Sequence, residues 1–387
     1  MIPDLLPHVQ KNWASLGLER KPKKLGCRLI PSGRKRHARL CQAVAIIYDG
    51  SAAEPVLIAK MRRGDSFVKE SRALKELRAE VSPRLARHIP RPLGTARIGD
   101  FFAYFESPLG GRPVAEMNAG FKPGETGYDS FNSGVFRRLG STLRLLYSTP
   151  KGFETVSAGM FAERVNPIIS GVASVLSLKG KAAAALQAGF EGIFDAHESL
   201  ELPNSLSHPD LSPYNALVPE RGSLMNLIDW EVPVRTPLPM CDLNTFALRH
   251  FVDSFSRRLV RGEFATEFGK AFVSLSGPFG SAFAEGIRLT GYPKEFAKPL
   301  LALSFAKEVC VQGENDCFPG VRSIEAKMLE EYLRAEFGVE ADLTRFSGHG
   351  LYYTNNTYAR REMRFLARMW KRTASNAGKA LALKMRV

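Results

Sequence analysis

The feature that most constrains the fold of this chain is a change of pattern at the segment PLGG, residues 108–111. Before it, short runs rich in β-branched and aromatic residues alternate with turn residues, and one stretch has helical spacing. After it, apolar residues recur mostly at the intervals of amphipathic helices. We therefore predict an α+β fold with two lobes: residues 1–107, a small antiparallel sheet with one helix, and residues 108–387, which are mainly helical.

The periodicity of the small lobe predicts its elements. Strands are expected over 25–30, 42–49 and 55–62, with the second and third joined as a hairpin. Residues 66–81 place apolar side chains at helical spacing and predict an amphipathic helix. Residues 95–107 predict a second hairpin, with Gly-Asp at its tip. The lobe should therefore carry one helix beside its sheet.

The larger lobe is predicted more coarsely. Residues 135–148 and 183–200 each place apolar side chains along one helical stripe. The segment SLMNLIDWEVPV, residues 223–234, is strand-like, and the chain after residue 240 has mainly helical patterns with Gly/Pro-rich breaks. With 387 residues and 44% hydrophobic content, the chain can bury more than one core.

Composition limits the compartment and the kind of site. No run of about 18 apolar residues predicts a membrane-spanning helix, and the first residues lack the pattern of a secretory signal. The five cysteines are scattered without a CxxC pair, which favours neither a disulfide framework nor a zinc site. We therefore expect a cytoplasmic protein.

Charge is concentrated at the two ends of the chain. The net charge is +15. Residues 1–39 contain ten Lys or Arg against two acidic residues, and residues 360–387 contain nine against one. Basic ends are typical of contact with anionic partners, and equally of solvated, soluble tails.

Chemistry is indicated by the stretch SHPDLSPYNALV, residues 207–218. Asp210 and Asn215 lie five residues apart in a polar loop between apolar runs, and Asp229 closes the next apolar run. Asp and Asn also form turns, so either residue alone would indicate a turn. Together, two carboxylates and a carboxamide at strand ends suit Mg²⁺ binding and the orientation of a hydroxyl for phosphoryl transfer.

A Lys and a Glu earlier in the chain complete this pattern. Lys60 ends the run VLIAK, where a strand would direct it toward phosphates, and Glu70 lies on the following helix. Such a Lys–Glu ion pair recurs in kinase-like enzymes. Glu76 is a competing partner, but its helical phase places it off the Leu74/Leu77 face. The order Lys, Glu, Asp, Asn, Asp therefore predicts a phosphotransfer site.

These motifs resemble a known family. HPDLSPYN and IDWE are similar to the catalytic and metal-binding motifs of the aminoglycoside phosphotransferase/choline kinase family, and ESRALKEL is similar to its N-lobe helix. The segment PMCDLNTFAL, with Asp242 as a structural acid, resembles the acidic segment that follows the metal motif. The resemblance covers roughly residues 25–250 and implies a protein-kinase-like fold.

The resemblance also implies a role for each matching residue. Asp210 would be the catalytic base, and Asn215 and Asp229 would bind Mg²⁺. Lys60 would contact the α- and β-phosphates of ATP, held by Glu70. The backbone from Glu106 to Leu109 would meet the adenine. A further match makes His208 a residue that shapes the loop rather than a general base.

Two segments depart from the family pattern. Pro209 stands where the family usually has Gly, and proline fixes φ and removes an N–H donor. The candidate phosphate loop, residues 31–40, has a single glycine, Gly33, and four Lys or Arg that could meet phosphate by charge. An alternative to an active kinase is therefore a kinase-like module that binds nucleotide or a partner without catalysis. The completeness of the five polar residues favours the enzyme.

The phosphate acceptor is less constrained. With a basic overall charge an aminoglycoside is not favoured, and a sugar, a phosphorylated metabolite or a glycolipid suits the chain at least as well. Residues 358–387 predict a helix with Arg and Lys on one face and apolar side chains on the other. Such a helix could bind an anionic membrane surface or pack on the body of the protein. No motif for nucleic-acid binding is present.

Overall fold

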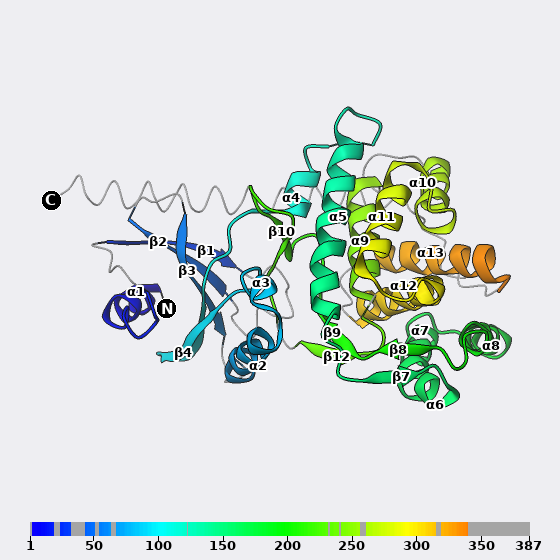
Figure 1. Cartoon of the computed structure of the whole chain (residues 1–387), viewed down its shortest axis with the longest axis horizontal. Helices are drawn as coiled ribbons and strands as arrows, with labels where there is room; N and C mark the ends of the chain where they lie inside the picture. The colour runs from blue at the N-terminus through cyan, green and yellow to red at the C-terminus, as the bar shows by residue number, and fades with distance from the viewer. Residues whose placement is uncertain are drawn as a thin grey trace.

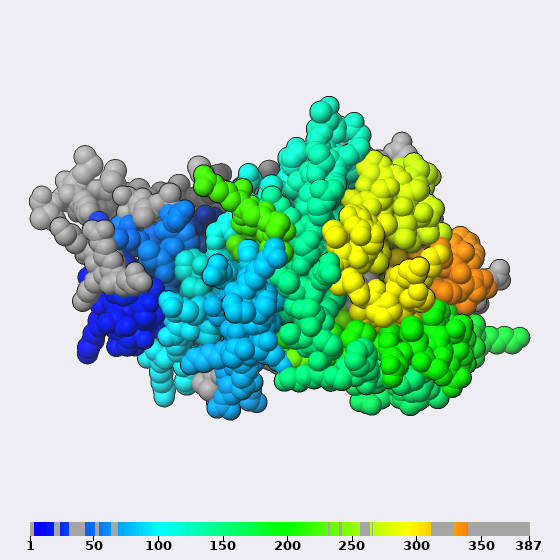
Figure 2. Space-filling view, viewed as in Figure 1, coloured from blue at the N-terminus to red at the C-terminus, as the bar shows by residue number. Residues whose placement is uncertain are grey.

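The computed structural model describes residues 2–18, 24–31, 43–50, 54–62, 67–121, 123–230, 233–239, 241–255, 261–314 and 319–339. Within them, a lobe containing a sheet lies beside a helical lobe along the long axis of the molecule (Figure 1). The space-filling view shows the same division, with blue N-terminal atoms toward one end and yellow and orange atoms toward the other (Figure 2). The predicted two-lobed α+β architecture is confirmed, while the exact lobe boundary at residue 107 stays a prediction.

The small lobe is built on a five-stranded antiparallel sheet in the order β1-β2-β3-β5-β4. Its strands are β1 (Leu25–Pro31), β2 (Ala43–Asp49), β3 (Pro55–Arg62), β4 (Pro92–Ile98) and β5 (Phe101–Glu106). Helix α2 (Phe67–Glu80) packs against β4 and β5. The three predicted strands, the helix and the second hairpin are all present, and their ends differ from the predictions by a few residues.

A further helix, α1 (Ile2–Lys11), covers part of this sheet beside β1 and β4. Buried side chains of α1 and of the turn after it pack against alternate residues of the strands, which share one face because side chains alternate along a strand. This core of the small lobe contains Leu5, Val9, Trp13, Leu16, Ala45, Ile47, Leu57, Ala59 and Phe105. The expectation of a single helix within residues 1–107 is therefore wrong, since α1 and the short helix α3 (Pro83–Ala86) were not predicted.

The rest of the chain is mostly helical, as predicted. Its α-helices are α3 (Pro83–Ala86), α4 (Val114–Asn118), α5 (Tyr128–Tyr147), α6 (Ala158–Met160), α7 (Asn166–Val175), α8 (Lys181–Asp195), α9 (Cys241–Phe255), α10 (Arg261–Phe268), α11 (Gly277–Thr290), α12 (Ala297–Glu314) and α13 (Pro319–Phe337). Two π-helical turns, η2 (Phe161–Val165) and η3 (Gly269–Val273), and a 3₁₀ turn, η4 (Lys294–Phe296), connect them. Helices α5 and α11 pack most extensively, and α12 contacts α7, α9 and α13.

Short strands also occur in the helical lobe. They form a three-stranded sheet of β11 (Asn226–Leu227), β10 (Ala216–Val218) and β6 (Arg112–Pro113), and the pairs β9 (Ser205–Ser207) with β12 (Val234–Thr236) and β7 (Phe153–Thr155) with β8 (Glu201–Pro203). The expected single strand over 223–234 is therefore wrong. Asp229 has φ +63°, a left-handed conformation that interrupts an extended chain.

Two sequence predictions fall outside the described residues. The candidate phosphate loop is described at Pro31 alone, and the basic C-terminal segment from residue 358 lies wholly beyond residue 339. Within the described ranges, no helix is long and apolar enough to cross a membrane.

Candidate active site

The site is centred on Lys60, whose amine lies between carboxylates from both lobes. Its Nζ is 3.2 Å from Glu70 Oε1, 3.0 Å from Asp229 Oδ1 and 3.6 Å from Glu106 Oε2. Lys60 comes from β3, Glu70 from α2 and Asp229 from the chain after β11. The structure thus brings Lys60 to the predicted partner Glu70, while Glu76 is exposed.

The charges around Lys60 stabilise one another in a buried setting. Burial acts to lower the pKa of Lys60, but Glu106, Asp229 and Glu70 together hold that pKa well above its usual value. Burial raises the pKa of Glu70 and of Glu106, and Lys60 offsets part of each increase. The ammonium therefore remains a fixed positive charge, which is what contact with phosphate oxygens requires.

The side chain of Glu106 has a position that the sequence did not indicate. It ends β5 with 5% of its surface exposed and points toward Lys60, whereas the prediction concerned the backbone of this segment. The next amide, Ser107 N–H, donates to Arg91 O at 2.8 Å, and Pro108 has no N–H. The Leu109 N–H has no hydrogen-bond partner among the described residues and is therefore the first free amide donor after β5.

The carboxylate of Asp242 fixes the start of the loop between β9 and β10. The carboxylate accepts hydrogen bonds from Ser207 Oγ and His208 N–H, both at 2.7 Å. Burial raises the pKa of Asp242 to about 7, against the effect of these hydrogen bonds. Pro209, which follows His208, lacks an N–H, so the amide of His208 is the last backbone donor before Asp210.

His208 is fully buried, and its contacts are to the segment around Asp229. Its Nε2 is 2.9 Å from Ile228 O, and its ring centroid is 4.3 Å from that of Trp230. Burial lowers the pKa of His208, and Nε2 donates to the Ile228 carbonyl, which can only accept. His208 therefore ties the loop to the segment that carries Asp229.

Two hydrogen bonds fix Asn215 in its loop. Asn215 Nδ2 donates to Asp210 O at 2.8 Å, which leaves Oδ1 as the acceptor atom of the carboxamide. The Ile228 N–H donates to Asn215 O at 2.9 Å, so the backbone of Asn215 is hydrogen-bonded to the residue before Asp229. The side chain of Asp229 is 45% exposed.

This donor set fits Mg²⁺. Hard oxygen ligands, one or two carboxylates and substrate phosphates are its usual partners in nucleotide-dependent enzymes. The described ranges contain no group of three or more His, Cys, Asp or Glu suited to hold a metal on their own.

The Asp210 carboxylate lies at the surface of the same region and is paired with a cation that the sequence did not indicate. Its side chain is 52% exposed, and Oδ1 accepts a hydrogen bond from Arg249 Nη1 at 2.8 Å. Arg249 also pairs with Glu308. Arg249 and Glu308 lie 39 and 98 positions after Asp210. No sequence spacing predicts contacts at such separations, because these contacts depend on how α9 and α12 pack.

Comparison with known proteins adds similarities of fold. No protein-family model matches the chain, and no curated protein does. The aminoglycoside phosphotransferase APH(3'')-Id of Streptomyces rimosus is 14% identical, over 78% of this chain and 98% of that one, with a TM-score of 0.38.

Two further solved structures are similar to the same degree. An aminoglycoside-3'-phosphotransferase of type VIII is 17% identical, over 68% of this chain and 94% of that one, with a TM-score of 0.37. The bifunctional kinase-methyltransferase WbdD is 14% identical, over 70% of this chain and 46% of that one, with a TM-score of 0.33. The similarity to aminoglycoside phosphotransferases expected from the motifs is thus found in the structures too. At these identities and scores, function has to be argued from the site itself.

Proposed function

We propose that this protein is an Mg²⁺- and ATP-dependent phosphotransferase that transfers the γ-phosphate to a hydroxyl group of a small molecule. One observation carries the proposal: Lys60, already paired with Glu70, lies 3.0 Å from Asp229 across the junction of the lobes. Phosphoryl transfer needs mainly positioning and charge neutralisation. A fixed cation beside a metal-binding carboxylate supplies both requirements.

Each residue then has a distinct task. Lys60 contacts the α- and β-phosphates, and Asn215 with Asp229 holds Mg²⁺, which neutralises phosphate charge when it is bound. Asp210 accepts the proton of the acceptor hydroxyl, for which its exposed carboxylate is accessible. The Leu109 N–H donates to the adenine ring, because Pro108 has no N–H and the Ser107 N–H already donates to Arg91 O.

The acceptor is proposed as a sugar or a glycolipid. The carboxylate of Asp210 is already matched by the guanidinium of Arg249, and the net charge of the chain is +15. Neither feature attracts a polycationic acceptor such as an aminoglycoside. A screen of sugars and glycolipids for ATP-dependent phosphorylation tests this class directly.

The first test of the activity is thermal unfolding of the protein with ATP, with and without Mg²⁺. A nucleotide that binds the folded state raises the unfolding midpoint, and we expect the larger shift with Mg²⁺. No Mg²⁺-dependent shift would contradict the proposal. A shift in a protein that phosphorylates none of the screened acceptors would favour the non-catalytic, nucleotide-binding module instead.

The second test is Asp210→Asn. Removing a general base costs roughly 10²- to 10⁴-fold in rate, so we expect kcat to fall in that range while the Mg²⁺–ATP thermal shift remains. Asp195→Asn, an exposed change at the end of α8, is the control and should leave both unchanged. An Asp210→Asn variant with normal kcat would remove Asp210 from the mechanism.

We also propose that the basic segment from residue 358 meets anionic membrane lipid. Its Arg and Lys residues and its apolar residues, Trp370 among them, would separate onto two faces of a helix, a pattern typical of interfacial helices. Co-sedimentation with liposomes containing anionic lipid would compare the full chain with a chain that ends at Tyr358. Equal pelleting of the two would contradict the proposal.

A further inference from the structure

The carboxylate of Asp210 is held by a single side chain. Within the described part of the chain, Arg249 Nη1 provides its one side-chain hydrogen bond, at 2.8 Å to Oδ1. Asp210 is half exposed and lies on a loop. An exposed carboxylate on a loop samples several rotamers unless a partner selects one. Arg249 is therefore in a position to select the rotamer of the proposed base.

Arg249 is itself fixed by a second carboxylate. Its Nε and Nη2 donate to Glu308 Oε2 and Oε1, both at 3.2 Å, a two-point contact that sets the plane of the guanidinium. Glu308 is 2% exposed. Arg249 extends from α9 and Glu308 from α12, two helices that pack together. The guanidinium is thus anchored to the rigid part of the helical lobe and directs Nη1 outward to the loop.

An anion-binding role suits this arginine less well. Both ends of its guanidinium already face carboxylates, so an anionic group of a substrate would have to displace Asp210 or Glu308. Positioning uses the arrangement as it stands. With Oδ1 occupied by Arg249, Oδ2 remains to accept the proton of an acceptor hydroxyl.

We propose that Arg249, anchored by Glu308, is the positioning residue of the Asp210 carboxylate, an inference that rests on the proposed phosphotransferase activity. Arg249 and Glu308 lie on two packed helices, α9 and α12, and their pairing fixes the guanidinium that contacts Asp210. The Asp210 side chain is thereby held in one orientation although it lies on a loop. Catalytic bases lose much of their effect when their orientation is relaxed. Removal of Arg249 should therefore lower kcat and leave nucleotide binding unchanged.

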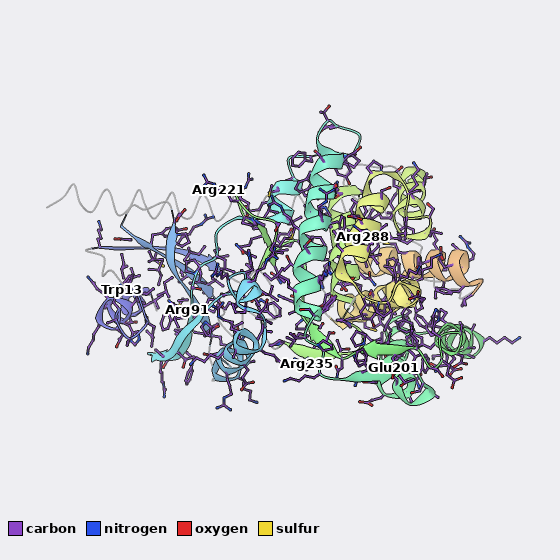
Figure 3. The ribbon with its side chains drawn as sticks, in the orientation of Figure 1. Trp13, Arg91, Glu201, Arg221, Arg235 and Arg288 are labelled. Atoms are coloured by element: carbon purple, nitrogen blue, oxygen red, sulfur yellow. The ribbon has the colours of Figure 1, made fainter. Side chains whose placement is uncertain are left out.

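The experiment removes the cation without leaving a buried charge. Arg249→Met alone strands Glu308, and an unpaired buried carboxylate can unfold the lobe. The double variant Arg249→Met/Glu308→Gln avoids this. The matched control is Arg288→Met/Glu285→Gln, which removes an exposed Arg–Glu pair of the same two-point geometry on α11. Arg288 is labelled in the helical lobe in Figure 3.

We expect kcat of the Arg249→Met/Glu308→Gln variant to fall roughly 10- to 100-fold, the scale of misplaced catalytic groups. KM for ATP and the Mg²⁺–ATP thermal shift should stay at the wild-type values, and the control should match wild type throughout. Arg249→Lys should recover part of the rate, because an ammonium keeps one contact to Asp210 but cannot make the two-point contact to Glu308.

Rescue separates positioning from a purely structural role. Millimolar guanidinium should raise kcat of the Arg249→Ala/Glu308→Gln variant, and it should not raise kcat when Asp210→Asn is added. Wild-type kcat in the double variant, or loss of kcat that tracks loss of nucleotide binding, would overturn the inference alone. Absence of phosphotransfer by the wild-type protein would overturn the proposed function and the inference together.

Discussion

At the scale of single residues, the proposed site consists of charges that are paired with one another. Lys60 contacts Glu70, Glu106 and Asp229, and Asp210 contacts Arg249. Pre-oriented charges reduce the reorganisation needed at the moment of reaction. In the proposed phosphotransferase, loss of one of these pairings should therefore reduce catalysis.

The pair of Glu70 and Lys60 can be tested against a neighbour on the same helix. A hydrogen bond to a charged group contributes about 1.5–3 kcal/mol, so Glu70→Ala should lower kcat/KM for ATP roughly 10- to 100-fold. Glu76→Ala, exposed on α2, is the control. Steady-state kinetics of the two variants checks the assignment, and equal effects of both would contradict it.

His250 predicts a pH dependence of stability. It is buried among Phe136, Phe246 and Phe279, and its Nε2 pairs with Asn132 Oδ1 at 2.8 Å. Burial lowers the pKa of His250 to about 3, whereas the unfolded chain binds the proton near pH 6.5. The free energy of unfolding contributed by this residue is therefore complete above pH 6.5 and is lost as pH falls toward 3.

Measurement requires a variant, because other groups titrate in the same range. Denaturant unfolding of wild type should lose up to about 1.4 kcal/mol per pH unit through His250 between pH 6.5 and 3. His250→Gln, which can still donate to Asn132, should show a correspondingly smaller loss over this interval. Identical pH profiles for the two proteins would show that His250 does not titrate as a buried neutral group.

At the scale of helices and strands, close packing of α5 against α11 determines the core of the helical lobe. A Cβ at Gly140 would lie 2.5 Å from Gly286 O and 3.0 Å from Leu289 Cβ, distances that real side chains do not occupy. Glycine at this position lets the two helices approach. Neither neighbour is the flexible end of a long side chain, so the backbone would have to move.

Substitutions on one helix test this packing. Gly140→Ala should destabilise the protein by about 1–3 kcal/mol, the usual cost of overpacking a core. Gly134→Ala on the same helix meets no heavy atom within 4 Å and should stabilise it by up to about 1 kcal/mol, because alanine loses less backbone entropy than glycine. Denaturant titrations of the two variants should give changes of opposite sign.

The elements also show where sequence patterns are sufficient. Alternation predicted β2 and β3, and helical spacing predicted α2, because each buries one face of a locally regular segment. Helix α5 begins at Tyr128, seven residues before the expected start. Its first two turns lie beside other elements whose positions the sequence does not specify.

Proximity between residues of the candidate site was predictable from the sequence where it is local or follows a characteristic spacing, and not elsewhere. Asp210 and Asn215 share one loop, so their proximity is local. Arg249 reaches Asp210 only through the packing of α9, and Glu106 reaches Lys60 because β3 pairs with β5 in one particular register. Both contacts depend on tertiary structure. The continuous strand expected around Asp229 does not form, because Asp229 itself is in a left-handed conformation that interrupts the extended chain.

At the scale of the whole molecule, Glu80 joins the two lobes. It ends α2 and pairs with Arg235 on β12 and with Lys151, whose Nζ lies 2.6 Å from Glu80 Oε1. Figure 3 labels Arg235 at this junction. Arg235 Nη1 also donates to Thr149 O and Asn204 O. The helix that carries Glu70 is therefore fastened to the helical lobe at its far end.

Glu80→Ala should loosen this junction. Glu80 is partly exposed, and loss of its charged hydrogen bonds costs up to about 1.5 kcal/mol, so we expect a lower unfolding midpoint and faster amide hydrogen exchange in the last turn of α2. Hydrogen-exchange mass spectrometry checks the location of the effect, with Glu76→Ala as the reference. Exchange in α2 that matches the reference would show that the lobes are joined elsewhere.

The position of α1 has a consequence for how the chain is made. Its apolar side chains are buried against residues as late as Phe105, whose ring lies 6.1 Å from that of His8. A ribosome adds roughly 5–20 residues each second, so α1 emerges several seconds before the strands that cover it exist. During that interval its apolar face is open to chaperones and to other nascent chains. The small lobe cannot be completed on the ribosome until the hairpin that ends at Glu106 has left the exit tunnel.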